Sequence, residues 1–105
     1  VDGFRVPNCP ACGGLLKPDV VYFGESVRPE VASAAEHAIE DADAVLVLGS
    51  SLAVHSALRL VRQAVRAGTP AVIVTDGPTR ADDLATVRVV DRVAPYVTAW
   101  RHAVT

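Results

Sequence analysis

The chain has 105 residues and a mass of 11.0 kDa, which is room for one domain of ordinary size. Half of its residues (50%) are hydrophobic and 21% are charged, a composition typical of a globular protein rather than a disordered one. A net charge of −2 with no polybasic run argues against a nucleic-acid or membrane partner, and the longest apolar run, residues 44–48, is too short to span a bilayer.

The first motif along the chain is Cys9-Pro-Ala-Cys12, which contains both cysteines. This spacing is typical of half of a four-cysteine zinc site and also of a thioredoxin-type redox pair. Gly13 and Gly14 follow at once and suit a tight knuckle whose backbone N–H groups point at thiolate sulfur, so the zinc half-site is favoured. Two thiolates do not close a tetrahedral site, and no histidine has an obvious ligand spacing, so two further ligands are expected outside the chain.

Strand and helix signals alternate after the knuckle. Residues 20–23 are β-branched or aromatic and precede Gly24, so a short strand is predicted there. Pro29 suits the first turn of a helix, and apolar residues then recur at helical spacing over residues 31–42. Residues 44–48 are apolar throughout, which is typical of a strand covered on both faces.

A second helix and a second apolar strand come next. Ser56 is the predicted N-cap of this helix, Leu58 begins its buried stripe, and Gly68 fits just past its end. Residues 71–74 are again apolar throughout, so they are predicted to form a strand buried on both faces.

The last third of the chain is expected to complete the sheet. Residues 76–78 form a turn signal, and Thr79 or Asp82 is predicted to cap a short helical turn. Residues 87–90 read as a further short strand, and residues 93–104 carry apolar side chains at helical spacing.

This order of elements predicts an α/β fold with a parallel sheet, preceded by the knuckle as a separate small element. In open parallel sheets, ligands bind beyond the carboxyl ends of the strands. Three loops leave such ends here, at residues 24–26, 49–51 and 75–77. A nucleotide-type ligand across the second and third loops is therefore expected.

Single residues in these loops are ambiguous. Gly49-Ser50-Ser51 either binds phosphate or ribose oxygens or simply ends a strand, because it is neither a GxGxxG nor a P-loop motif. Asp76 suggests a ribose-binding acid, but without the glycine fingerprint a turn residue is favoured. His55 has no nucleophile placed for it, and Asp82-Asp83 more often cap a helix start, so non-catalytic roles are favoured for both.

Taken together, the motifs are more specific. Residues 9–25 (CPACGGLLKPDVVYFGE), then a strand leading into residues 49–54 (GSSLAV), then residues 77–83 (GPTRADD) resemble, in this order, the sirtuin family of NAD-dependent protein-lysine deacylases. The residues before Cys9, Lys17 and the Thr-Arg-x-Asp-Asp run look most like the class II branch of that family. The resemblance implies the C-terminal half of a doubly wound, Rossmann-like NAD-binding domain over residues 19–105, preceded by half of a small zinc module over residues 1–18.

The resemblance also implies site residues. Cys9 and Cys12 match the second half of a structural Zn²⁺ site. The acyl-lysine peptide cleft, where the substrate backbone adds as a strand, matches Val21, Tyr22, Phe23, Gly24 and Glu25, with Val54 across from them. The NAD-binding loops match Gly49, Ser50, Ser51, Thr75, Asp76, Gly77 and Val93.

Two departures from the family are visible. Thr75 stands where the family usually has Asn, and losing one hydrogen bond to a ribose hydroxyl is expected to weaken NAD binding by about 1 kcal/mol. The glycine-rich NAD motif and the catalytic His of the family are expected upstream of Val1, and His55 does not match the catalytic position. No catalytic residue is therefore assigned to this chain.

The sequence starts at Val1 and contains no methionine, so we expect a processed product, an excised piece or an incomplete record. The intact protein is expected to transfer an acyl group from lysine to ADP-ribose and release nicotinamide, with the fragment inactive alone. Alternatives are a non-catalytic NAD or ADP-ribose-binding module, an ADP-ribosyltransferase of the same family, and, at fold level, the central domain of thiamine-diphosphate enzymes. With no secretory signal pattern and thiols expected to hold metal, the cytoplasm is the expected location.

Overall fold

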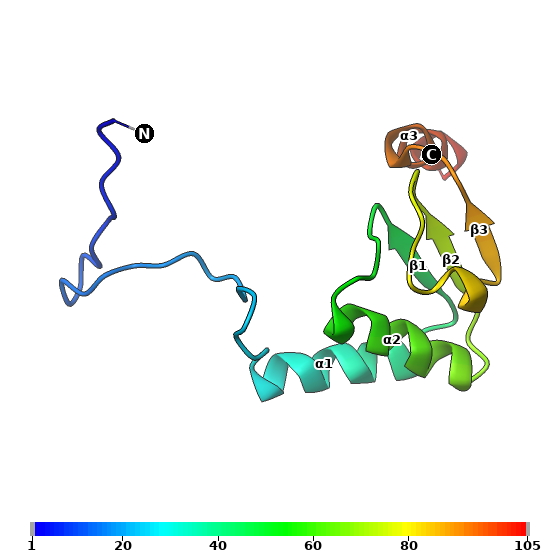
Figure 1. The fold of residues 1–105 in the computed structure, drawn as a ribbon, viewed down its shortest axis with the longest axis horizontal. Coiled ribbons are helices and arrows are strands. Elements are labelled where there is room, and N and C mark those ends of the chain that lie inside the picture. The colour runs from blue at the N-terminus through cyan, green and yellow to red at the C-terminus, as the bar shows by residue number, and fades with distance from the viewer. Residues whose placement is uncertain (1, 105) are drawn as a thin grey trace.

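A computed structural model describes residues 2–104 of the chain. Residues 2–28, here called the N-terminal arm, lead into an α/β body (Figure 1). The elements of the body are α1 (Pro29–Glu40), β1 (Val45–Leu48), α2 (His55–Arg66), β2 (Ala71–Val74), the 3₁₀ turn η1 (Asp82–Leu84), β3 (Val87–Val89) and α3 (Val93–Ala103). Among these described residues, no helix is both long and apolar enough to cross a membrane.

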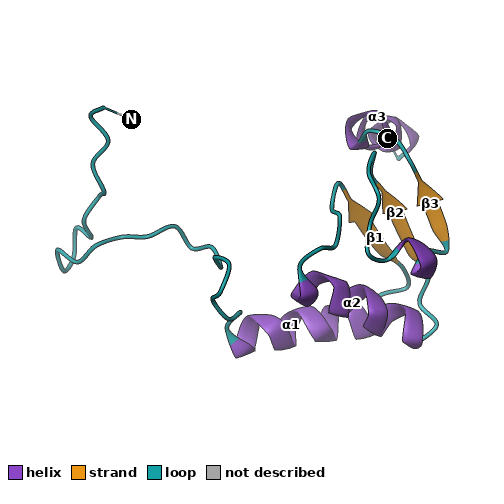
Figure 2. Cartoon of the chain, in the orientation of Figure 1, coloured by secondary structure: helices purple, strands orange, loops and turns teal. Residues whose placement is uncertain are grey.

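The three strands form one parallel sheet in the order β1-β2-β3. Val45 lies opposite Ala71 and Val72 lies opposite Val87, so the carboxyl ends of all three strands meet at one edge. Helix α1 packs against α2, and α2 packs against β2, whereas α3 lies at the carboxyl end of the sheet (Figure 2). The predicted α/β fold with a parallel sheet is therefore confirmed.

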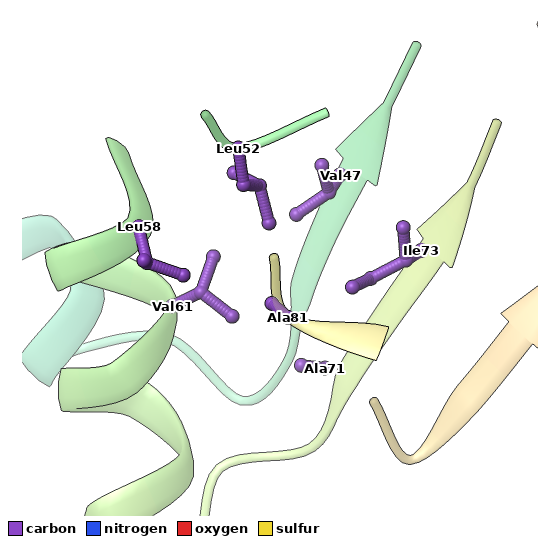
Figure 3. Packing of buried hydrophobic residues seen from close by; sticks show 7 residues of the cluster. All are labelled: Val47, Leu52, Leu58, Val61, Ala71, Ile73 and Ala81. Carbon is purple, nitrogen blue, oxygen red and sulfur yellow. The ribbon is translucent and has the colours of Figure 1, made fainter. Parts of the chain in front are cut away.

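The hydrophobic core lies between one face of the sheet and α2. Leu58 of α2 and Ile73 of β2 have no exposed surface, and both belong to the cluster between the helix and the sheet (Figure 3). Buried side chains from β1, β2, α2 and two loops complete the cluster: Val47, Leu52, Val61, Ala71 and Ala81. Burial of a Leu or Ile side chain stabilises a fold by about 1.5–3 kcal/mol, so this face fixes how α2 sits on the sheet.

The opposite face of the sheet is only partly covered by the described residues, with Val74 of β2 4% exposed there. In β1, Val47 is buried, but Leu46 and Leu48 remain 37% and 39% exposed. The strand predicted at residues 44–48 is confirmed as β1. The prediction that it is covered on both faces was wrong, because residues 2–104 leave one of its faces exposed. The apolar stripe of α3 is likewise open, with Val97 47% and Trp100 52% exposed.

Residues 20–23 do not form the predicted strand. Residues 20–22 form no regular element, a turn follows at Phe23 and Gly24, and Phe23 is 96% exposed. A strand requires a partner to satisfy its backbone N–H and C=O groups, and the described part of the chain brings no other strand beside this segment. The β-propensity of residues 20–23 was therefore insufficient to form a strand without a neighbouring strand.

The predicted start of the second helix was also displaced. Helix α2 begins at His55, one residue before the predicted cap Ser56, and its N-cap is Val54, which makes no side-chain capping bond. Leu58 N–H donates to the Val54 carbonyl at 3.1 Å, so the main chain closes the first turn without a capping side chain. The predicted end before Gly68 is confirmed by the helix bounds.

Candidate functional site

The cysteine motif folds into a tight knuckle. Cys9 N–H donates to the Gly14 carbonyl at 2.7 Å, and Gly13 N–H donates to the Cys9 carbonyl at 2.8 Å. Gly13 has a φ of +72°, a conformation that glycine adopts without strain. Backbone N–H groups of Cys12 and Ala11 hydrogen-bond to the Cys9 sulfur and lower the pKa of its thiol, because they stabilise the thiolate.

This geometry fits half of a zinc site. Both Cys9 and Cys12 are free thiols, and N–H groups directed at a thiolate sulfur are what a metal-bound thiolate requires around it. Residues 2–104 bring no group of three or more His, Cys, Asp or Glu side chains together. The knuckle can therefore supply two of the four ligands, and the zinc site stays a prediction.

The arm and α2 enclose a groove of about 650 Å³, here called the arm groove. Its walls are the arm segment 21–27 and the beginning of α2, which contributes Val54, His55, Ser56 and Arg59. The sequence-predicted peptide segment, residues 21–25, and Val54 thus lie on the same groove although about thirty residues separate them. His55 is exposed at its rim.

Local hydrogen bonds hold the arm side of this groove. Glu25 N–H donates to the Tyr22 carbonyl at 3.0 Å, and Tyr22 N–H donates to Glu25 Oε2 at 3.0 Å. Lys17 Nζ lies 3.1 Å from Glu25 Oε1 and 5.1 Å from the centroid of the Tyr22 ring. The Tyr22 N–H, followed by Lys17, lowers the pKa of Glu25, so its carboxylate stays charged and holds the turn at Gly24.

The loop after β1 has the geometry of a close-approach site. Gly49 has a φ of +63°, and an added Cβ there would lie 3.4 Å from Val93 Cγ2, at the start of α3. Ser50 Oγ accepts the N–H of Leu52 at 3.2 Å, and Leu52 itself has a positive φ of 53° with 4% exposure. This loop is thus held tightly between the sheet and the first turn of α3.

The loop after β2 meets the same edge of the sheet. Thr75 N–H donates to the Val89 carbonyl at 3.2 Å, and the Thr75 residue is only 6% exposed, whereas Asp76 is exposed. Loops 49–51 and 75–77 follow neighbouring parallel strands and therefore lie at the same edge of the sheet. Their backbone N–H groups can donate to the phosphate oxygens of a nucleotide, and the Asp76 carboxylate can accept hydrogen bonds from its ribose hydroxyls. Their role in cofactor binding stays a prediction.

Two arginines that sequence reasoning did not single out join these loops. The Arg80 side chain donates to the Ala53 carbonyl at 2.9 Å, and its backbone N–H donates to the Ser51 carbonyl at 3.0 Å. Arg88 donates from Nη1 to the Thr75 carbonyl at 3.0 Å. The available signal was a single charged residue inside the apolar run 87–90, which indicates a side chain that finds partners rather than solvent.

Asp82 is the carboxylate partner of Arg88. Its Oδ1 lies 2.8 Å from Arg88 Nε, and it accepts the hydroxyl of Thr79 at 2.6 Å and the Thr79 N–H at 3.1 Å. The predicted short helical turn is confirmed as η1, but its N-cap is Ala81 rather than Thr79 or Asp82. Asp82 instead uses its carboxylate to hold Thr79 and Arg88 together.

Replacing Asp82 by Asn is expected to make the melting temperature depend less on pH in the acid range. Hydrogen bonds from Thr79, and then from Arg88, hold the pKa of Asp82 below its usual 3.8. A carboxyl whose pKa is lowered by folding stabilises the fold above its unfolded-state pKa, and this stabilisation is lost as pH falls towards the folded-state value. The difference in melting temperature between wild type and Asp82→Asn should therefore be largest near neutrality and shrink as pH falls through 3.8.

The control for this measurement is Asp83→Asn, which removes the same charge from the exposed neighbouring position. Thermal melts of both variants and the wild type across the acid range provide the comparison. If the difference in melting temperature between wild type and Asp83→Asn shrank equally as pH fell, the role given to Asp82 would be contradicted.

The sequence profile of the Sir2 family matches residues 2–56, which is more than half of the chain. The chain belongs to the Sir2 family. The match includes the knuckle, the loop after β1 and, apart from Arg59, the residues given above for the walls of the arm groove.

Sir2-family relatives and structures support the same placement. The chain is 56% identical over 88 residues to an NAD-dependent protein deacetylase of Xanthomonas campestris pv. campestris strain 8004, covering 84% of this chain and 30% of that protein. It is 50% identical over 98 residues to NAD-dependent protein deacetylase 1 of Streptomyces coelicolor, covering 93% of this chain and 33% of that one. The chain thus spans about a third of the length of these relatives.

Solved Sir2 structures superpose on most of the chain. A structure of Sir2 bound to acetylated peptide matches with a TM-score of 0.80 and 35% identity, covering 93% of this chain and 41% of that one. A complex of Sir2 with a p53 peptide and NAD⁺ matches with a TM-score of 0.80 and 33% identity, covering 95% and 42%. The predicted sirtuin membership and the Rossmann-like fragment are therefore confirmed, while the class II branch stays a prediction.

Proposed function

We propose that this chain is the C-terminal part of a longer NAD-dependent protein-lysine deacylase. The observation that carries the proposal is the arm groove, which brings residues 21–25 and Val54 together. The NAD-dependent deacetylases to which the chain is similar, and the Sir2 structures with acetylated peptide and with NAD⁺, support it. The proposed substrates are acylated lysine side chains of proteins, and the proposed location is the cytoplasm.

In this proposal the arm groove holds the peptide backbone on either side of the acylated lysine. The main-chain groups of Tyr22 already bond to Glu25, so the main-chain groups of Val21 and Phe23 are the ones proposed to pair with a peptide that adds beside them. Main-chain pairing recognises extended backbone rather than side chains, so tolerance of many flanking sequences follows. Val54 on the opposite wall, which is 49% exposed, supplies an apolar surface for the acyl-lysine stem.

The loops at the carboxyl edge of the sheet hold the cofactor. When bound there, NAD supplies the ribose carbon to which the acyl oxygen is transferred as nicotinamide leaves. Residues 49–51 are proposed to contact its phosphates and ribose, Val93 to lie near the adenine, and residues 75–77 to meet the adenosine ribose. The positive φ of Gly49 and its approach to Val93 leave backbone rather than side chain at the position where the cofactor would lie.

Zinc has a structural role in this proposal. Cys9 and Cys12 would provide two thiolates, and a thiol pair earlier in the longer protein would provide the other two. The knuckle does not adjoin the cofactor loops, since the arm extends away from the sheet (Figure 1). The metal would therefore fix the shape of the arm rather than activate water.

The full-length protein that contains this chain should consume NAD only when an acyl-lysine peptide is present. Incubation with NAD and an acetyl-lysine peptide, followed by mass spectrometry, should detect the deacetylated peptide, nicotinamide and O-acetyl-ADP-ribose. An unmodified lysine peptide of the same sequence is the control. NAD consumption with transfer of ADP-ribose to protein would instead support the transferase alternative.

A non-catalytic NAD or ADP-ribose-binding module is the second candidate. It is favoured by Thr75, whose 6% exposure leaves little of the hydroxyl available to a ribose. Calorimetry of the full-length protein with NAD, in the presence and absence of acyl peptide, separates the two functions. Binding without formation of O-acetyl-ADP-ribose would support the module and contradict the deacylase.

A further inference from the structure

Arg88 occupies an unusual position for an arginine. It lies in the middle of β3, and its side chain is only 17% exposed. Its guanidinium donates to four different acceptors: Asp82 Oδ1 at 2.8 Å, the Thr75 carbonyl at 3.0 Å, the Gly77 carbonyl at 2.5 Å, and the Val89 carbonyl. An arginine on an exposed surface donates mainly to water, whereas this guanidinium donates to four acceptors within the protein. Arg88 is therefore held in one orientation.

Two of the three carbonyl partners of Arg88, those of Thr75 and Gly77, flank the exposed residue Asp76. Thr75 and Gly77 direct their carbonyl oxygens at the guanidinium, and Thr75 N–H is bound to the Val89 carbonyl at 3.2 Å. These three bonds hold the peptide groups 74–75, 75–76 and 77–78, which bracket Asp76. Asp76 is thereby the exposed carboxylate that the loop presents, while Thr75 is buried.

We propose that Arg88 is a positioning residue of the cofactor cradle, which holds loop 75–77 so that Asp76, rather than Thr75, receives the ribose hydroxyls. This inference rests on the proposed function, since it takes the loop as part of an NAD site. A carboxylate accepts hydrogen bonds from two neighbouring hydroxyls, which a buried threonine hydroxyl cannot do. Arg88 acts through the loop and does not itself touch the cofactor.

The orientation of Arg88 is fixed from its other side. Asp82 accepts the Arg88 Nε–H and is itself held by the hydroxyl and N–H of Thr79. The guanidinium is a planar fork, so a fixed Nε–H bond also fixes where Nη1 and Nη2 point. A lysine at this position would keep the charge but lose the fork, and one ammonium cannot reach both loop carbonyls in the same geometry.

A second clamp makes the two cofactor loops one unit. Arg80 donates to the carbonyls of Ser51 and Ala53, so the segment that follows loop 75–77 is bound to the loop that follows β1. Displacement of loop 75–77 would therefore be transmitted towards loop 49–51. Loss of Arg88 should consequently affect the cofactor more than the peptide, whose groove is lined by residues 21–27 and the beginning of α2.

The test uses the full-length protein with Arg88→Gln, Arg88→Lys and the control Arg62→Gln, an exposed arginine of α2. Both Arg88 variants should raise the KM for NAD about tenfold, equivalent to about 1.4 kcal/mol, while kcat and the peptide KM change less than about twofold. Hydrogen exchange of a peptide covering residues 75–84 should speed up in Arg88→Gln and remain unchanged in Arg62→Gln.

A double variant tests the route through Asp76. If Arg88 acts by presenting this carboxylate, Asp76→Asn should weaken NAD binding in the wild type and have little further effect in Arg88→Gln. Additive losses, or a KM for NAD that stays within twofold in Arg88→Gln, would overturn the proposal. An equal rise in the KM for NAD and the KM for peptide, together with a lower melting temperature, would also overturn it, because that pattern marks a structural residue.

The two proposals fail in distinguishable ways. A wild-type protein that forms no O-acetyl-ADP-ribose contradicts the deacylase function before any variant is made. If the wild-type protein forms O-acetyl-ADP-ribose and Arg88→Gln has the same KM for NAD, only the role of Arg88 is contradicted.

Discussion

Replacement of Leu58 by alanine should lower the free energy of unfolding by about 3 kcal/mol. Leu58 has no exposed surface and lies in the cluster that joins α2 to the sheet, with Val47, Leu52 and Ile73 among its members. Its truncation removes buried methyl groups and leaves a cavity that the rigid strands cannot fill. Urea unfolding followed by circular dichroism measures the change.

The matched control for Leu58→Ala is Arg62→Ala, at an exposed position of the same helix. This substitution should change the free energy of unfolding by less than about 0.5 kcal/mol, since it removes no core contact. Equal destabilisation by the two variants would show that helix propensity, rather than packing against the sheet, dominates at α2.

Replacement of Cys12 by serine should abolish zinc binding by the full-length protein. A serine hydroxyl is a much poorer zinc ligand than a thiolate, and a four-coordinate structural site rarely survives with three ligands. Metal analysis should find the zinc content falling from about one ion per chain to near zero. Deacylation should fall at least about tenfold, because loss of a hydrogen-bond partner of a metal ligand already costs about this much activity, and Cys12 is itself a proposed ligand.

Pro10→Ala is the control for the zinc experiment, because it alters the knuckle between the cysteines while keeping both thiols. This variant should retain its zinc. A wild-type protein that contains no zinc and forms a Cys9–Cys12 disulfide on mild oxidation would instead support the redox interpretation of the motif.

The elements that sequence alone placed correctly are those whose signal is local. Residues 45–48 and 71–74 are short apolar runs bounded by turn residues, and they form the neighbouring strands β1 and β2. The run at residues 20–23 has comparable β-propensity but forms no strand, because a strand is completed by a partner that the described residues do not supply. Propensity identifies a candidate strand, and pairing decides it.

The candidate site divides in the same manner. Position along the chain placed loops 49–51 and 75–77 at the carboxyl ends of strands, because parallel strands bring those ends together. The resemblance to the Sir2 family added the peptide segment, which no periodicity would have indicated. Arg88 was missed because its partners are backbone carbonyls of a distant loop, and sequence carries no sign of which carbonyl a side chain will meet.

The N-terminal arm has a consequence for how this molecule can change over time. None of residues 2–28 is buried, and the core that holds the body together draws on no side chain from them. Substitutions in the arm are therefore almost free of any penalty in folding of the body. The sequence of the arm can therefore change while the α/β scaffold stays under a separate constraint.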